Sequence, residues 1–149
     1  MTNELKKQIE IIMIKLKELD AVYHAAALKS GTPYGEFCVW CALINTEQEY
    51  SQQELADFLS LPIQTINSII TNLKKRELLY LEHVPGSRNK KVICLTQKGE
   101  EYGKDKVLWI LNAEQKAMEE TDAEEVKACI SMLGKYIFSL RKELDIAEK

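Results

Sequence analysis

One predicted helix in this sequence has a polar face that carries hydrogen-bonding groups instead of charges. Between Pro62 and Arg76 the isoleucines recur at helical spacing, so they share one side, while amide and hydroxyl side chains occupy the other. These groups both donate and accept hydrogen bonds, as readout of DNA base edges requires, whereas a uniformly charged face would contact only phosphates. The alternative is an ordinary solvated helix surface. The candidate contacts to bases or nearby phosphates are Gln64, Thr65, Asn67, Ser68 and Thr71.

Cations cluster close to this helix although the chain as a whole is acidic. Residues 62–91 hold six Lys or Arg and two acids, a net charge of +4, against −3 for all 149 residues. An acidic chain argues against a nucleic-acid-binding protein, but a local basic segment favours contacts to DNA phosphates. We therefore expect two groups of residues to contact the DNA backbone, with an arginine entering the minor groove as the alternative. They are Lys75 with Arg76, and Arg88, Asn89, Lys90 and Lys91.

The residues before the polar helix predict a second, shorter helix. Ser51 and Glu54 have the spacing of a capping box, which predicts a helix over 52–59. Ser51 and Gln52 would then lie at a helix N-terminus, where backbone N–H groups can hold a phosphate. Pro62 breaks the chain and starts the polar helix, over 62–76.

The residues after the polar helix predict a hairpin. Strand-forming residues over 78–84 and 92–95 flank the turn segment PGSRNKK, so the tip of the hairpin would be basic. Thr96 is the expected N-cap of the helix that follows. A short capped helix, a break, a second helix and a hairpin are the order of elements in a winged helix-turn-helix, which would span 51–95.

Two long helices at the ends of the chain carry apolar seams. We expect them over 3–29 and 122–147, the second opened by a capping box of Thr121 and Glu124. A small domain does not need two such seams for its own core, so they indicate a partner, most simply a second copy related by two-fold symmetry. Two recognition helices would then face half-sites about 10 base pairs apart. The other helices are expected over 33–46 and 97–119, and Gly31 is the expected C-terminal cap of the helix over 3–29.

The segment from Tyr50 to Gly103 resembles the DNA-binding half of the MarR (multiple antibiotic resistance) family, including LTQKG over 95–99. The flanking helices match too, so the resemblance covers essentially the whole chain. It implies a mainly α winged helix-turn-helix protein of one domain, in which 3–46 and 97–147 form the dimerisation and core region. It also implies a homodimeric transcriptional regulator that binds double-stranded DNA at an inverted-repeat operator and is modulated by a small-molecule effector.

The sequence departs from the family pattern at three places. Glu77 stands where a glycine commonly ends the recognition helix, and Ser68 stands where an arginine is frequent. The wing has SRN where a pair of an acidic residue and an arginine is frequent, and Arg88 is the best match to that arginine. The missing recognition-helix arginine argues against a high affinity for DNA.

Aromatic residues of the first two helices could line an effector pocket, although such residues more often pack helices together. They are Tyr23, His24, Tyr34, Phe37 and Trp40.

The cysteines do not indicate a metal site. Cys38 and Cys41 have Cys-x-x-Cys spacing, but neither His24 nor His83 has a spacing that completes a zinc site. The four cysteines are expected to be reduced and to pack as small apolar residues. Oxidation sensing by Cys38 or Cys41 is the alternative.

Other functional classes have little support in the sequence. No nucleophile and base arrangement or phosphate-binding glycine loop stands out, so we expect neither an enzyme nor a bound cofactor. No signal peptide or membrane span is expected, which favours the cytoplasm. The alternative function is a winged-helix protein-interaction module without specific DNA binding, which the −3 charge and the missing arginine would favour.

Overall fold

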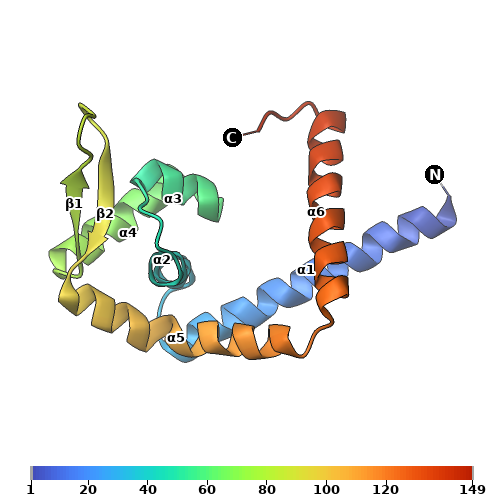
Figure 1. Cartoon of the computed structure of the whole chain (residues 1–149), viewed down its shortest axis with the longest axis horizontal. Coiled ribbons are helices and arrows are strands. Elements are labelled where there is room, and N and C mark those ends of the chain that lie inside the picture. The colour runs from blue at the N-terminus through green and yellow to red at the C-terminus, as the bar shows by residue number, and fades with distance from the viewer. Residues whose placement is uncertain (1, 149) are drawn as a thin grey trace. The chain divides into compact units, whose positions relative to one another are not determined.

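The computed structural model describes residues 2–148, which form six helices and one antiparallel hairpin (Figure 1). The chain forms two compact units that divide after Ile110, within α5. The predicted class, mainly α with a two-stranded wing, is confirmed. In chain order the elements are α1 (Asn3–Ser30), α2 (Tyr34–Asn45), α3 (Gln52–Leu59), α4 (Ile63–Lys75), β1 (Leu79–His83), β2 (Lys91–Leu95), α5 (Gln97–Glu119) and α6 (Ala123–Glu143).

The core of the first unit is built from the apolar faces of α2, α3 and α4. Ile66, Ile70 and Leu73 lie on one side of α4 and are buried, together with Leu55 of α3. Trp40 of α2 is fully buried. Removing each such side chain from water stabilises the fold by roughly 1.5–3 kcal/mol. Because the apolar side of α4 is held in this core, its polar side must face outward.

The hairpin is attached both to the end of α4 and to the start of α3. Its strands pair antiparallel, from Leu79 opposite Leu95 to His83 opposite Lys91. The N–H of Ile93 in β2 also donates to the carbonyl of Tyr50 at 2.8 Å, just before α3. Figure 1 shows the hairpin beside α4. The wing and the helix-turn-helix are therefore one connected structure.

Three predicted helix ends are confirmed. Ser51 and Glu54 form the capping box, with Glu54 N–H donating to Ser51 Oγ at 3.1 Å and Ser51 N–H donating to Glu54 Oε1 at 3.2 Å. Thr96 caps α5, since its Oγ1 accepts from the N–H of Gly99 at 3.0 Å. Gly31 closes α1 in the left-handed conformation, with φ of 72°. Each involves groups a few residues apart, which is why the sequence revealed them.

The predicted capping box at the start of α6 is wrong. Asp122, not Thr121, is the N-cap: its Oδ2 accepts from the N–H groups of Glu124 and Glu125, both at 3.1 Å. The Thr121 hydroxyl instead donates to the carbonyl of Ala117 at 3.3 Å. A carboxylate accepts two N–H groups and also complements the positive end of the helix dipole, so it outcompetes the neighbouring hydroxyl. This helix also ends at Glu143, earlier than the predicted 147.

Glu77 adopts a backbone conformation that favours glycine. It follows α4 with φ of 59°, and the N–H groups of Glu77 and Leu78 donate to the carbonyls of Lys74 and Leu73, both at 3.0 Å. This pair of hydrogen bonds is a Schellman motif, whose left-handed residue is usually glycine. A Cβ at this position costs free energy in the folded state.

We expect Glu77→Gly to raise the free energy of unfolding by roughly 0.5–1 kcal/mol, because relief of the left-handed strain exceeds the entropy that glycine adds to the unfolded chain. Chemical denaturation at a fixed protein concentration measures this change. Glu77→Ala is the control, because it removes the same carboxylate and keeps a Cβ, so it should not stabilise. Equal stabilisation by both variants would assign the effect to the lost charge.

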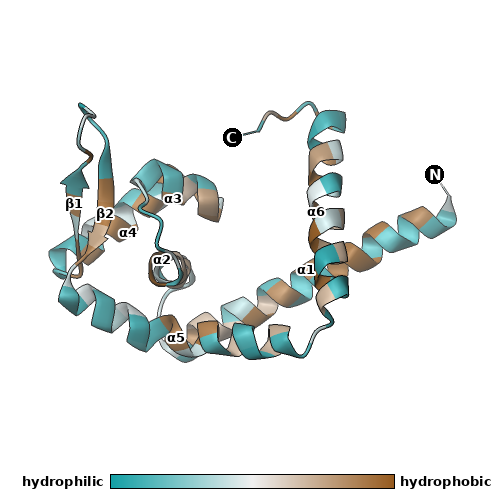
Figure 2. Cartoon of the chain, viewed as in Figure 1, coloured by the Kyte–Doolittle hydropathy of each residue, from teal (hydrophilic) through white to brown (hydrophobic). Residues whose placement is uncertain are grey.

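Large apolar side chains remain exposed along the terminal helices. None of the residues 123–143 of α6 is buried, and in α1 only Ala26 and Ala27 are. Figure 2 shows apolar residues recurring along both helices. No helix within residues 2–148 is long and apolar enough to cross a membrane. The exposed apolar side chains include Leu5, Ile11, Met13, Ile14, Leu16, Leu19 and Val22 in α1, and Ile130, Met132, Ile137, Phe138 and Leu140 in α6.

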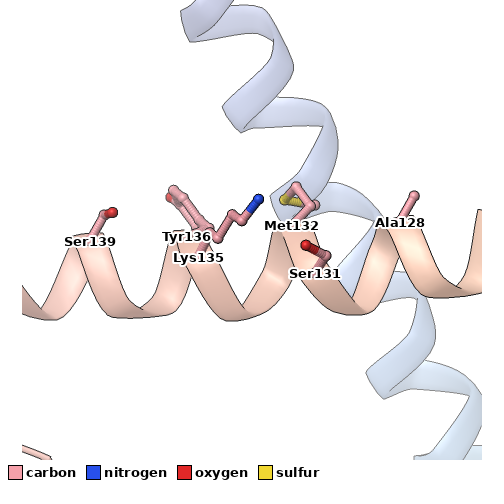
Figure 3. Close-up of a pocket in the computed structure, with 6 residues that line it drawn as sticks. All are labelled: Ala128, Ser131, Met132, Lys135, Tyr136 and Ser139. Carbon is pink, nitrogen blue, oxygen red and sulfur yellow. The ribbon is translucent and has the colours of Figure 1, made fainter.

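One side of α6 forms a shallow hollow, and all the residues that line it belong to this helix. Figure 3 shows its six residues projecting from one side of α6. Met132 and Tyr136 provide its larger apolar surfaces and Lys135 its charge. The remaining lining residues are Ala128, Ser131 and Ser139.

Candidate nucleic-acid interface

The polar side of α4 is an accessible surface. Ile66 and Ile70 are buried beneath it, which fixes the rotation of the helix about its own axis. The predicted base-contacting residues, Gln64, Thr65, Asn67, Ser68 and Thr71, are all exposed. A shallow hollow along this face is lined by Asn67, Ser68, Thr71, Asn72 and Lys75. The structure therefore brings the predicted residues together on one face, and their role in base contacts stays a prediction.

The LTQKG segment attaches the start of α5 to the end of α4. The Thr96 hydroxyl donates to the carbonyl of Glu77 at 2.7 Å, and the Thr96 N–H donates to the carbonyl of Leu78 at 3.1 Å. Gly99 lies so close to this backbone that an added Cβ would be 1.7 Å from Leu78 O. The segment thus sets the position of α4 relative to the first turn of α5.

Arg76, a predicted contact to the DNA backbone, is directed toward α2. Its Nη1 lies 3.2 Å from Glu36 Oε1 and 3.1 Å from Asn72 Oδ1, and its guanidinium carbon lies 5.0 Å from the centre of the Tyr102 ring. The Glu36 side chain is only 13% exposed, so separating this pair would leave a largely buried carboxylate unpaired. A phosphate contact by Arg76 must compete with Glu36, whereas Lys75 is exposed at the same end of α4.

The wing tip presents its cations to solvent, and one of them pairs with α3. Arg88, Asn89, Lys90 and Lys91 are all exposed. The ammonium of Lys90 lies 3.1 Å from Glu54 Oε1, the carboxylate that also closes the capping box of α3. Hydrogen bonds from Ser51, with Lys90 adding to them, lower the pKa of Glu54 below its ordinary value. This carboxylate therefore stays charged near neutral pH and ties the wing to α3.

Gln52, a predicted phosphate contact, is hydrogen-bonded to the polar face of α4. Its Nε2 donates to Asn67 Oδ1 at 2.8 Å. Neighbouring Ser51 uses its hydroxyl to accept from the N–H of Glu54. Sequence reasoning did not find the Gln52–Asn67 pair, because its two residues lie on different helices and no periodicity relates them.

Structures with this order and arrangement of elements are known. A MarR family regulator from Neisseria meningitidis aligns with a TM-score of 0.79 and 18% sequence identity, covering 93% of this chain and 96% of that chain. The chain has the MarR fold. CouR from Rhodococcus jostii RHA1, solved with bound p-coumaroyl-CoA, aligns with a TM-score of 0.68 and 17% identity, covering 92% of this chain and 96% of that chain.

A third solved structure of the MarR fold is BpsR from Bordetella bronchiseptica, whose DNA binding is regulated by 6-hydroxynicotinic acid. It aligns with a TM-score of 0.60 and 22% identity, covering 85% of this chain and 90% of that chain. No model of a known protein family matches the chain, and no curated protein does. At these identities the likeness establishes the fold.

Within the MarR fold, the predicted effector residues fall into two environments. His24 of α1 stacks on Tyr34 of α2 with ring centroids 3.6 Å apart, and Asp20 lies 3.3 Å from the Tyr34 hydroxyl and 3.4 Å from His24 Nε2. Burial raises the pKa of Tyr34 to about 12, with the nearby Cys38 and Asp20 adding to the shift, so this phenol stays protonated. His24 and Tyr34 thus form a polar, partly exposed cluster.

Two of the other predicted effector residues, Phe37 and Trp40, lie in the core instead of this cluster. Phe37 is 1% and Trp40 0% exposed, and Tyr23 is half-buried. The Trp40 indole N–H is already used, since it donates to Glu36 Oε1 at 3.1 Å. An effector would reach Phe37 or Trp40 only through an opening of the core.

The four cysteines of this chain are all free thiols. Burial raises the pKa of Cys38, with Asp20 opposing the thiolate as well, so this sulfur is a protonated and poor nucleophile near neutral pH. Burial also raises the pKa of Cys94, helped by Glu82. Within residues 2–148, no group of three His, Cys, Asp or Glu is arranged to hold a metal ion.

Proposed function

We propose that this protein is a sequence-specific DNA-binding transcriptional regulator that acts as a homodimer on an inverted-repeat operator and is modulated by a small-molecule effector. The observation that carries the proposal is the exposed, uncharged hydrogen-bonding face of α4, mounted beside a cationic wing in a MarR fold. Such a face suits base-edge readout, and the wing cations suit phosphate contacts. The regulators among the structural neighbours support the same class of function.

The exposed apolar faces of α1 and α6 support the dimer. A contiguous apolar stripe in a stable protein marks an interaction surface, and closed two-fold symmetry satisfies it with a second copy. Two copies would also present two α4 helices to successive major grooves, as an inverted repeat requires.

Two observations support modulation by an effector. The structures of BpsR and CouR, which have the same fold, are associated with small molecules, and this chain has one cluster that could bind such a ligand. His24, Tyr34 and Asp20 combine stacked rings with hydrogen-bonding groups at the junction of α1 and α2. An effector bound there would act by changing the spacing of the two recognition helices. If every ligand that binds leaves operator affinity unchanged, this part of the proposal fails.

The remaining parts of the proposal follow from the regulator role. A regulator acting on chromosomal DNA works in the cytoplasm of a bacterial cell, where free thiols also persist. It needs no catalytic activity, and its structural neighbours are regulators, not enzymes.

The test is selection of bound fragments from a random duplex pool, repeated at low and high salt. The expected result is an inverted repeat with centres about one helical turn apart and an affinity that falls steeply with salt. The alternative, a winged-helix protein-interaction module, is favoured by the −3 net charge and by Ser68 in place of an arginine. Recovery of no fragment by folded, dimeric protein would select this alternative.

Arg88→Ala is expected to weaken binding to all duplexes alike, because a wing arginine would contact the DNA backbone, which is the same in every sequence. The slope of log affinity against log salt concentration should become shallower by about 1 for each phosphate that Arg88 neutralises. Lys142→Ala is the control, since it removes an exposed cation of α6, outside the winged helix. An unchanged salt slope for Arg88→Ala, or an equal effect in the control, would contradict the placement of the wing on DNA.

A further inference from the structure

Two carboxamides on different helices form a short hydrogen bond at the candidate DNA surface. Gln52 belongs to the first turn of α3, and its Nε2 donates to Asn67 Oδ1 in α4 at 2.8 Å. Asn67 is exposed and Gln52 is half-exposed, so both amides remain accessible. A solvent-facing Asn normally samples several orientations, and this bond restricts which edge of the amide points outward.

The first turn of α3 is itself held from two sides. Glu54 closes the capping box with Ser51 and pairs with Lys90 of the wing at 3.1 Å. Gln52 lies inside this turn, between the cap and the rest of the helix. The group that orients Asn67 is therefore mounted on a backbone that is anchored to the wing.

The hydrogen-bonding capacity of the pair matches one base. An Asn carboxamide oxygen has two lone pairs and its nitrogen has two N–H groups. With one lone pair of Asn67 Oδ1 taken by Gln52, the other lone pair and both N–H groups remain for a partner, and one of these N–H groups lies beside that lone pair on the same edge of the amide. An acceptor and a donor side by side fit the N6–H and N7 of adenine in the major groove.

Resting on the proposed function, we infer that Gln52 and Asn67 are a two-residue reader of an A·T base pair. Asn67 contacts the adenine edge, and Gln52 is the positioning residue that holds the Asn67 amide in the required orientation. This assigns Gln52 to base specificity, which a contact to phosphate would not provide.

The experiment measures the affinity of the selected operator duplex and of variants in which each symmetric base pair is replaced in both half-sites. The proteins are wild type, Gln52→Leu, Asn67→Ala and the double variant. Gln53→Leu is the matched control, since it makes the same change one residue away, where the amide donates to Asp57 of its own helix at 3.1 Å.

Wild-type protein is expected to prefer A·T over other pairs at one symmetric position by roughly tenfold or more. Gln52→Leu should reduce that preference to roughly threefold or less and leave the preferences elsewhere unchanged. Asn67→Ala should remove it, and the double variant should match Asn67→Ala, because residues acting as a unit are not additive. Gln53→Leu should behave as wild type.

Three results would overturn the inference while leaving the proposed function intact. They are an equal loss of affinity for all duplexes in Gln52→Leu, an unchanged base preference in Gln52→Leu, and additive losses in the double variant. Failure of folded, dimeric wild type to select any duplex would instead overturn the proposed function, and this inference with it.

Discussion

Gly99→Ala is expected to prevent the first unit from folding stably. The new Cβ would lie 1.7 Å from the carbonyl oxygen and 2.6 Å from the carbonyl carbon of Leu78, which are backbone atoms that no side-chain rotation can move. To relieve the overlap α5 must shift, which breaks the hydrogen bonds of Thr96 to Glu77 and Leu78. We expect a loss of at least about 4 kcal/mol, a large part of the stability of an ordinary domain.

The loss is measured by chemical denaturation, with the soluble fraction after expression as a first indication. Gly134→Ala is the control, because it makes the same substitution inside a helix where an added Cβ meets nothing within 4 Å. That variant should be neutral or stabilised by up to about 1 kcal/mol, from helix propensity. Near wild-type stability of Gly99→Ala would show that α5 does not dock against Leu78 as described.

The double substitution Ile130→Asp with Ile137→Asp is expected to give a folded monomer that has lost operator binding. These side chains are 66% and 45% exposed, so the new charges should not unfold the protomer. They lie seven residues apart on the apolar seam of α6, where two carboxylates buried at a dimer interface would be strongly unfavourable. Because a dimer gains affinity from simultaneous contact with two half-sites, binding should fall by roughly 100-fold or more.

Sedimentation and operator titration measure the two effects separately. Ser131→Asp with Ser139→Asp is the matched control, since both residues lie on the other side of α6, in the hollow of Figure 3. It adds the same two charges to the same helix and should remain dimeric. If the variant with Ile130→Asp and Ile137→Asp remains dimeric, the proposed interface is refuted. If the control is monomeric, the interface lies at the hollow instead.

Features that depend on neighbouring residues could be read from the sequence. Four- and three-residue spacing identified the buried side of α4, and the Ser51–Glu54 box, Thr96 and Gly31 identified helix ends. The choice between two adjacent N-cap residues was harder to predict. Asp122, not Thr121, caps α6 because a carboxylate accepts two N–H groups. The winged helix-turn-helix could be predicted because its elements are short and their order is distinctive.

The sequence by itself determined which faces are apolar, which segments are helices or strands, and where hydrogen-bonding groups gather. Only the tertiary structure decided which polar groups pair: Arg76 with Glu36, Lys90 with Glu54, and Gln52 with Asn67. It also placed Phe37 and Trp40 in the core, apart from the His24 and Tyr34 cluster. Periodicity follows from the geometry of one element, whereas a hydrogen bond between elements depends on distances that arise only when their apolar faces pack together.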